Sequence, residues 1–214
     1  MKINIIIYFL DKPFSMLYRF TKTWFLESEL SKKLLFFVPT NKKHNVLEIG
    51  CYEGLSSVYF SDTILSDSES TLTCVDPFLN VDDNDHGHLL QNKEEENFDY
   101  NISNSKNFHK ITVFKVTSDE FFALNTKYFD FIYIDGCHLT EIVARDVENS
   151  FKFLEKNGII WMDDYVYPPC KIAIDKFLEI HKNEYVIIHE GYQLAIRKIC
   201  NYDNEYELEL QQQT

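Results

Sequence analysis

Short apolar runs alternate with amphipathic stretches from Asn45 to Lys198. The apolar runs have the length of buried strands, and the stretches between them carry apolar residues at helical spacing. The runs predict strands at 46–49, 71–75, 112–116, 129–134, 158–162, 185–189 and 192–198, and the stretches predict helices at 55–65, 93–100, 118–124, 139–154 and 171–180. Strands separated by helices form a parallel sheet that is covered on both faces. The pattern therefore predicts an α/β, Rossmann-like fold with a seven-stranded, mostly parallel sheet and an antiparallel C-terminal strand pair.

Local signals set the expected boundaries of two helices. Ser118 is expected to cap the helix that begins there, since a hydroxyl accepts a hydrogen bond from a free backbone N–H group. Asn157 and Gly158 are expected to end the helix at 139–154, because glycine tolerates the left-handed conformation found at a helix C-terminus.

The chain is expected to consist of three regions. Residues 1–44 predict a helical extension that packs on the core. Residues 45–200 predict the main domain, with a polar insert at 80–107, and residues 201–214 predict an acidic, disordered tail. The insert and the aromatic N-terminal region are expected to form a wall or lid over a binding site.

The composition argues against nucleic acids and membranes as binding partners. The 214 residues carry a formal net charge of −13, and no run of Lys or Arg is longer than a pair such as Lys42-Lys43. Nucleic-acid binding depends on basic patches that contact phosphates, so this partner is not expected. No segment approaches the roughly 20 apolar residues of a membrane helix, and five scattered cysteines are typical of thiols in a reducing compartment. We expect a cytoplasmic protein without a membrane partner, which can form a homo-oligomer.

Acidic side chains follow two of the expected strands. Asp135 follows the strand at 129–134, with His138 three residues later, and Asp163 and Asp164 follow the strand at 158–162. Ligands bind at the carboxyl ends of parallel strands, and neighbouring strands lie about 4.8 Å apart, so these carboxylates can meet around one ion. An all-oxygen set favours Mg2+, with Mn2+ or Ca2+ as alternatives, over zinc. Alternatively, Asp135 caps the following helix and Asp163-Asp164 is an exposed turn.

A glycine turn follows the first expected strand. Gly50 and Gly54 allow a tight turn and a close approach of the backbone to a ligand. The spacing matches neither a dinucleotide fingerprint nor a phosphate-binding loop. Asp76, at the end of the next strand, is placed to accept hydrogen bonds from ribose hydroxyls. The glycine turn and Asp76 together predict a nucleoside pocket. The alternative is that the turn has only a structural role.

Four ordered motifs make the sequence recognisable: VLEIGCYEGLSS, TCVDPF, FDFIYIDGCHLTE and NGIIWMDDY. They resemble the class I S-adenosylmethionine-dependent methyltransferases. More narrowly, they resemble the metal-dependent O-methyltransferases, which include catechol O-methyltransferase and the macrolide-sugar methyltransferases. The resemblance covers residues 45–198 and leaves out the first 40 residues and the insert at 80–107.

The resemblance implies a role for each candidate residue. The residues implied to bind S-adenosylmethionine are Glu48, Gly50 and Gly54 at the methionine moiety, Ser56 at its carboxylate or amine, Asp76 at the ribose, Ser118 at the adenine, and Asp135 beside the donor. The common glycine is missing before Ser118. The implied metal ligands are Asp135, Asp163 and Asp164, and the implied general base is His138, whose ordinary pKa suits proton removal near neutrality.

The predicted reaction is a divalent-metal-assisted transfer of a methyl group from S-adenosylmethionine to a hydroxyl. The acceptor is expected to be a small molecule, sugar or glycan, and a vicinal diol would chelate the metal well. Two alternatives remain: a metal-independent small-molecule methyltransferase, and a binding protein that retains the fold without catalysis. A nicotinamide oxidoreductase is disfavoured because its glycine fingerprint is missing.

Overall fold

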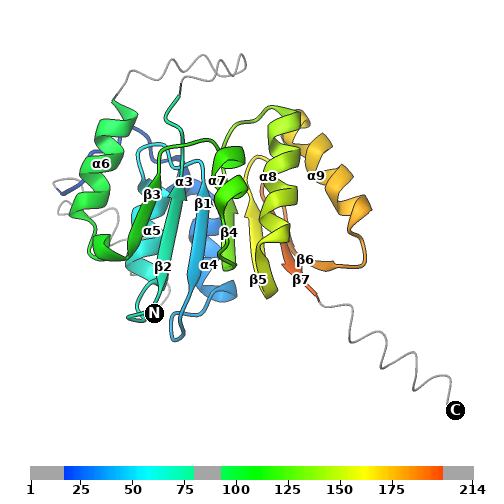
Figure 1. Cartoon of the computed structure of the whole chain (residues 1–214), viewed down its shortest axis with the longest axis horizontal. Coiled ribbons are helices and arrows are strands. Elements are labelled where there is room, and N and C mark those ends of the chain that lie inside the picture. The colour runs from blue at the N-terminus through cyan, green and yellow to red at the C-terminus, as the bar shows by residue number, and fades with distance from the viewer. Residues whose placement is uncertain (1–16, 80–92, 200–214) are drawn as a thin grey trace, which may run out of the picture.

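The computed structural model describes residues 17–79 and 93–199, and the termini and residues 80–92 lie outside this part. Seven strands form one sheet: β1 (Asn45–Ile49), β2 (Thr71–Val75), β3 (Ile111–Phe114), β4 (Phe129–Ile134), β5 (Leu154–Met162), β6 (Tyr185–Glu190) and β7 (Leu194–Lys198). The strand order is β3-β2-β1-β4-β5-β7-β6 (Figure 1). The pairs among β1 to β5 are parallel, and β7 is antiparallel to both β5 and β6. The predicted fold class is confirmed.

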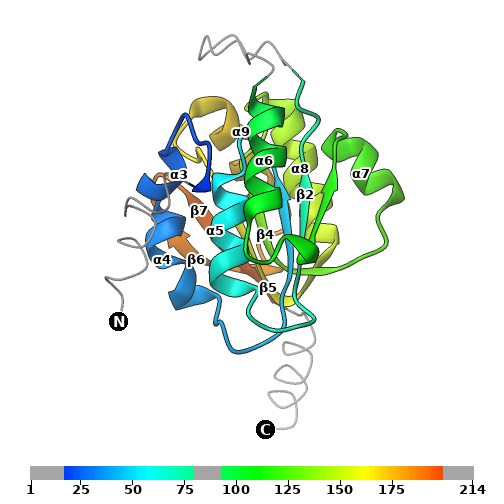
Figure 2. The same cartoon turned by 90° about the vertical axis from the view of Figure 1, so that its left-hand side faces the viewer.

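Helices cover both faces of the sheet (Figure 2). The described helices are α3 (Trp24–Glu27), α4 (Glu29–Phe37), α5 (Leu55–Ile64), α6 (Glu94–Asn104), the short 3-10 helix η1 (Phe108–Lys110), α7 (Ser118–Leu124), α8 (Thr140–Lys152) and α9 (Pro168–Ile180). One hydrophobic core lies between one face of the sheet and helices α4, α5 and α6. The other lies between the opposite face and helices α7, α8 and α9. Because β1 lies between β2 and β4, the chain turns from one half of the sheet to the other there, and ligands bind at such a switch point.

Two expected helix boundaries are wrong. Thr117, one residue earlier than expected, caps α7 through a reciprocal pair of bonds with Glu120. Helix α8 ends at Lys152, and β5 begins at Leu154, so Asn157 and Gly158 lie inside a strand. The register of β4 against β5 shifts there, and Asn157 has a φ of +61°. The residue pair that favours a left-handed helix end therefore forms an irregularity in a strand.

Helix α4 docks on the β6–β7 hairpin through a polar network. One carboxylate oxygen of Glu29 accepts from the backbone N–H of Gln193 at 3.0 Å and lies 2.9 Å from Nε2 of His189. The Gln193 side chain accepts from the backbone N–H of Leu30 and from the indole of Trp161. The N-terminal helix thereby fixes the hairpin at the end of β5 that carries Asp163.

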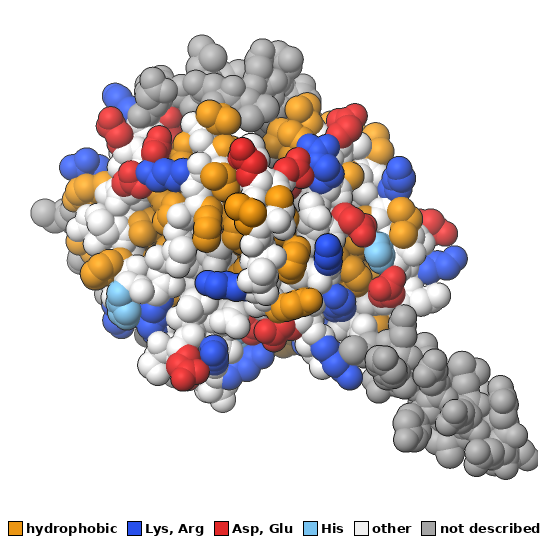
Figure 3. Space-filling model, viewed as in Figure 1, with side chains coloured by type: hydrophobic (Ala, Val, Ile, Leu, Met, Phe, Trp, Pro, Cys, Tyr) orange, Lys and Arg blue, Asp and Glu red, His pale blue; other side chains and the backbone are white. Residues whose placement is uncertain are grey.

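Hydrophobic side chains gather over α7 and the neighbouring strands on the face shown in Figure 3. Exposed residues of this region include Phe114, Leu124 and Tyr128. Contiguous exposed apolar surface is typical of contact surfaces, and the oligomeric state stays a prediction. No helix in the described ranges is long and apolar enough to span a bilayer.

Candidate active site

The sheet ladder fixes the backbone of the two strand-end aspartates. The N–H of Asp135 donates to the carbonyl of Ile49 at 2.8 Å, and the N–H of Asp163 donates to the carbonyl of Ile134 at 2.9 Å. Both bonds continue the parallel pairing one residue beyond the strands. Asp135 and Asp163 are therefore neighbours at the carboxyl edge, as the order of the motifs predicts.

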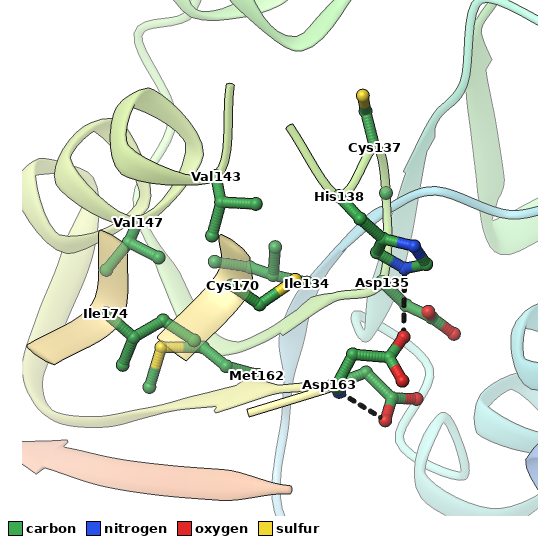
Figure 4. A pocket seen from close by; sticks show the side chains of 12 residues that line it. Ile134, Asp135, Cys137, His138, Val143, Val147, Met162, Asp163, Cys170 and Ile174 are labelled. Atoms are coloured by element: carbon green, nitrogen blue, oxygen red, sulfur yellow. Dashed lines mark hydrogen bonds and ion pairs between the residues drawn. The ribbon is translucent and has the colours of Figure 1, made fainter. Parts of the chain in front are cut away.

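Three potential ligand atoms converge at this edge. One atom each from Asp135, His138 and Asp164 lie within 4.8 Å of one another, and all three residues are half-buried. Nε2 of His138 is 2.9 Å from Oδ2 of Asp164 (Figure 4). The other oxygen of Asp164 accepts from the hydroxyl of Tyr192. The Asp164 carboxylate thus lies between an imidazole and a phenol.

A buried tyrosine joins the third aspartate to this group. The hydroxyl of Tyr133 lies 2.6 Å from Oδ2 of Asp163 and 2.9 Å from Oδ2 of Asp135. Its ring has no exposed surface and packs edge-on against Phe25 and Phe60. Oδ1 of Asp163 accepts from the backbone N–H of Asp164 at 2.8 Å. The three carboxylates and His138 therefore form one connected cluster.

Without a cation, the negative charges of the three carboxylates repel one another. Burial raises the pKa of Asp135 well above its usual range, and the negative charges of Asp163 and Asp164 raise it further. Burial also raises the pKa of Asp163, with a second contribution from the charge of Asp164. A divalent ion would remove this repulsion, and its oxygen-rich surroundings fit a hard cation. The three carboxylates fit a hard cation such as Mg2+, while the converging atoms also include the imidazole nitrogen of His138, so the identity of the metal stays a prediction.

The alternative reading of Asp135 as a helix cap is wrong. Leu139 occupies the N-cap position of α8, and no side chain caps that helix end. The Asp135 carboxylate instead contacts the hydroxyl of Tyr133.

An apolar pocket lies behind the cluster. Its polar end consists of Asp135, His138, Asp163 and Asp164, and its apolar end consists of side chains from β4, β5, α8 and α9 (Figure 4). The apolar end continues into the core on the α8–α9 face. Low-polarity surroundings on this side explain why burial is the largest influence on the carboxyl pKa values.

The glycine turn is in direct contact with the acidic cluster. Gly50 has a φ of +82°, and a Cβ there would lie 2.0 Å from the backbone oxygen of Asp135. Gly54 has a φ of +80°, and a Cβ there would meet the ring of Phe98 at 3.0 Å. Both positions therefore favour glycine because their backbone is left-handed. At Gly50 a side chain would also clash with the Asp135 backbone.

Asp76 holds the turn in place. Its Oδ2 accepts from the backbone N–H groups of Cys51 and Tyr52, at 2.7 and 3.0 Å, and its Oδ1 accepts from that of Phe78 at 2.8 Å. Burial raises the pKa of Asp76, and these bonds oppose the rise. A carboxylate has about four acceptor sites, so one remains for a ribose hydroxyl. The expected ribose contact stays a prediction.

Glu48 and Ser56 are bonded to each other. Both serine hydroxyls at the start of α5, Ser56 and Ser57, donate to the carboxylate of Glu48, which has no exposed surface. Burial raises the pKa of Glu48 to about 7 in spite of these bonds. Because the Ser56 hydroxyl donates to Glu48, it can still accept from an ammonium group. The predicted contacts of both residues with a methionine moiety stay predictions.

Ser118 begins α7 and is half-buried. Its side chain bonds to Asp146 of α8, and burial raises the pKa of Asp146 to about 6 against the effect of that bond. The predicted contact of Ser118 with adenine stays a prediction.

Two structural features escaped the sequence reasoning. Tyr133 lies two residues before Asp135, so strand alternation places both side chains on one face, and this signal was available. Tyr192 reaches Asp164 from the β6–β7 turn, and no local pattern signals that contact.

The N-terminal segment and α6 close over the glycine turn. The buried carboxylate of Glu53 accepts from the backbone N–H of Thr21 at 2.5 Å and from the side chain of Asn97 at 2.7 Å. Asn101, also buried, bonds to the carbonyl of Glu53 and to both backbone groups of Arg19. These described parts of the expected wall therefore contact the turn, and residues 80–92 of the insert lie outside the described part.

The fold and the site together place the chain in a known class. A family model described as a methyltransferase domain matches residues 47–165, which include the glycine turn, Asp76 and the acidic cluster. The chain belongs to this methyltransferase-domain family. The match confirms the resemblance to methyltransferases that the four motifs carry, and the metal dependence stays a prediction.

Solved structures of low sequence identity share the fold. One is the O-methyltransferase TomG from Streptomyces achromogenes in complex with SAM, with 13% identity, a TM-score of 0.61 and 81% of each chain covered. Another is an O-methyltransferase from Bacillus cereus in complex with SAH, with 15% identity, a TM-score of 0.54, and 92% of this chain and 100% of that chain covered. A putative rRNA methylase from Clostridium thermocellum has 13% identity and a TM-score of 0.62, with 81% and 97% covered. No curated protein matches the sequence.

Proposed function

We propose that the protein transfers the methyl group of S-adenosylmethionine to a hydroxyl oxygen with the help of a divalent cation. The observation that carries this proposal is the contact between the glycine turn and the acidic cluster. The Asp135 backbone lies against Gly50, while its side chain belongs to the cluster. A donor bound at the turn would therefore be adjacent to a cation bound at the cluster.

The comparisons support the choice of donor. The family is a methyltransferase-domain family. TomG is described in complex with SAM, and the Bacillus cereus enzyme is described in complex with SAH. In this chain Ser56 and Asp76 supply the free acceptor positions for an ammonium group and a ribose hydroxyl. Asp135 closes the pocket on the side of the sulfonium.

Three carboxylates would hold the cation: Asp135, Asp163 and Asp164. A divalent cation at such a site supplies Lewis-acid chemistry, which lowers the pKa of an acceptor hydroxyl. Tyr133 and the backbone of Asp164 hold the Asp163 carboxylate in place through the bonds described above. The protein thus orients the ligands before any cation arrives.

His138 is the proton acceptor in this proposal. The bond from the donor sulfur to the methyl carbon breaks as the bond from the acceptor oxygen to that carbon forms, and the hydroxyl proton passes to His138. The 2.9 Å contact with Asp164 orients the imidazole. Direct displacement needs alignment more than a protein nucleophile.

The surroundings of the cluster suit an acceptor with a ring and two neighbouring hydroxyls. Tyr192, Leu139 and Val166 are exposed next to residues of the cluster and offer an apolar rim. On the other side of the turn, the exposed Trp24 stacks on Tyr52 with ring centroids 5.9 Å apart. A vicinal diol of a sugar or a catechol-like ring combines both requirements.

The contact between His138 and Asp164 also favours a second candidate, which is a metal-independent O-methyltransferase. A carboxylate that orients a histidine is sufficient for general-base catalysis in other enzymes. In that case Asp164 would serve the imidazole alone, and the reaction would need no cation.

The test combines donor binding with methyl transfer. Calorimetric titration with S-adenosylhomocysteine is expected to give one site per chain. Panels of catechols and sugars are then screened by mass for a gain of one methyl group, with EDTA and with Mg2+ restored. Activity that EDTA abolishes and Mg2+ restores supports the proposal, and full activity in EDTA selects the metal-independent candidate. Failure to bind the cofactor product would overturn both.

A matched pair of variants separates the site from general effects of charge. Asp163→Ala is expected to abolish Mg2+-dependent turnover while affinity for S-adenosylhomocysteine changes little. Glu179→Ala removes the same charge from an exposed position on α9 and is expected to leave turnover unchanged. An unchanged rate in Asp163→Ala would refute its role as a metal ligand.

A further inference from the structure

A second cavity opens at the end of the sheet opposite the candidate active site. It has a volume of about 640 Å3 and is lined by residues at the amino ends of β1, β4 and β5. These strand ends lie in the lower part of Figure 1. Its walls are residues 36–39 at the end of α4 and just beyond it, residues 42–45, Asp130, residues 155–159 and Arg197. The size falls within the range of small-molecule sites, roughly 300–1,000 Å3.

The charge of this cavity contrasts with that of the whole protein. Its walls carry four cationic side chains, Lys42, Lys43, Lys156 and Arg197, and two acidic ones, Asp130 and Glu155. The cations exceed the acids by two, although the whole chain carries a net charge of −13. A local surplus of this sign attracts anions.

One of the two acids is already neutralised by neighbours. Asp130 accepts from the backbone N–H of Asn45 at 2.7 Å, lies 2.6 Å from Nδ1 of the buried His44, and pairs with Lys42 at 3.7 Å. Its carboxylate is therefore directed to the wall at the start of β1. Lys42 is thereby engaged by Asp130, and Lys43 pairs with Glu69 at 3.3 Å, so the cations without an acidic partner in the described part are Lys156 and Arg197, on β5 and β7.

Arg197 is the best-placed cation for a ligand. It is half-buried on β7, opposite Ile159 of β5, so its side chain shares the face of the sheet that α4 covers. The chain has three arginines. Arg145 pairs with Asp119 and Arg19 lies over the ring of Tyr100, but within the described part no hydrogen bond or ion pair is made by the side chain of Arg197, whose backbone pairs with β5 and β6. A half-buried guanidinium without a protein acceptor can present its fork of donors to an anion.

An aromatic wall accompanies the charge. Phe36, at the end of α4, is 74% exposed, and its ring meets that of Phe37 edge-on with centroids 4.9 Å apart. Phe37 in turn packs near Trp161 of β5. An exposed phenylalanine that is supported in this way offers a flat surface to a ring or apolar group.

We propose that this cavity binds a phosphate monoester that carries a ring or apolar substituent. The two cations without an acidic partner in the described part, Lys156 and Arg197, suit the charge of such a phosphate, about −1.5 to −2 near neutral pH. Arg197 presents paired donors to two phosphate oxygens, while Lys156 on β5 supplies a second positive charge. The substituent lies against Phe36. The site is separate from the carboxyl edge of the sheet, so a phosphate bound there would not compete with the donor or acceptor of the proposed methyl transfer.

The test is a calorimetric titration of the full chain with phenyl phosphate at low ionic strength. Saturable binding with one site is expected, at least tenfold weaker in Arg197→Gln. Arg145→Gln removes the same charge from α8 and is expected to bind within a factor of two of the unchanged chain. Phe36→Ala is expected to weaken phenyl phosphate several-fold while affinity for inorganic phosphate stays constant. If Arg197→Gln does not fold, Lys156→Gln replaces it, with an expected loss of at least threefold.

Three results would overturn the proposal. One is the absence of saturable binding of phenyl phosphate by the unchanged chain. A second is an equal loss of affinity in Arg145→Gln and Arg197→Gln, which would indicate attraction by overall charge. A third is binding of benzoate as tight as that of phenyl phosphate, which would show that the site does not select a phosphate.

Discussion

Replacing Tyr133 by phenylalanine removes one hydroxyl that lies within hydrogen-bond distance of two carboxylates. The ring can stay in place because its packing against Phe25 and Phe60 involves no hydroxyl contact. A hydrogen bond to a charged group contributes about 1.5–3 kcal/mol to stability. Without a divalent cation, at pH 8, Tyr133→Phe is therefore expected to lower the free energy of unfolding by about 1.5–3 kcal/mol.

A cation should reduce this loss. The hydroxyl and a divalent cation both act on the repulsion between Asp135 and Asp163, so the cation matters more when the hydroxyl is gone. Saturating Mg2+ is expected to stabilise Tyr133→Phe by about 1 kcal/mol more than it stabilises the unchanged chain, a fraction of the value of the lost bond. Urea unfolding with and without Mg2+ measures both quantities.

Tyr59→Phe is the matched control. Tyr59 is also buried, but its hydroxyl donates to the neutral carbonyl of Ser31 at 2.6 Å. Tyr59→Phe is expected to lower the free energy of unfolding by about 0.5–1.5 kcal/mol, and by the same amount with and without Mg2+. The reasoning is refuted if Tyr133→Phe is no less stable than Tyr59→Phe without metal, or if Mg2+ stabilises both variants equally.

Three further predictions follow from the geometry. Gly50→Ala is expected to lower the free energy of unfolding by more than the roughly 1–2 kcal/mol of a left-handed alanine, because its Cβ would also clash with the Asp135 backbone. Gly136→Ala is the control, since its Cβ would meet nothing closer than 3.5 Å, and it should change stability little in thermal unfolding. The pKa of Asp146 is raised to about 6 from 3.8, so its folded form binds a proton more readily, and its contribution to stability is complete below pH 3.8 and lost as the pH rises through 6. Asp146→Asn should remove that slope in unfolding measured from pH 3.5 to 7.5, and an unchanged slope would count against the burial argument. His138→Gln is expected to lower kcat at pH 7 at least tenfold, and a rate within a factor of two would exclude it as the base.

The sheet was predictable because its signals are local and repeated. Each parallel strand contains a short, mainly apolar run, and the α8 residues Val143, Val147 and Phe151 recur on one buried face. The acidic cluster was predictable for a related reason. Side chains that follow parallel strands share one edge, whatever their distance in sequence.

Other features depend on contacts that no local pattern reports. The left-handed Asn157 has the sequence of a helix end, and only its pairing with β4 makes it part of a strand. Glu53 looks like a solvent-exposed turn residue, but the N-terminal segment and α6 bury it. Arg197 is ordinary in sequence, and its value as an anion site comes from the cavity around it.

The most direct test of the central claim is the distance between a bound cation and the methyl group of the donor. S-adenosylmethionine with a 13C-labelled methyl group is bound to the protein, and its NMR relaxation is compared with saturating Mg2+ and with paramagnetic Mn2+. Strong Mn2+-dependent broadening of the methyl signal is expected, and Asp163→Ala should abolish it while the donor stays bound. A methyl signal that relaxes equally with both ions, in a chain shown to hold donor and cation together, would contradict the account.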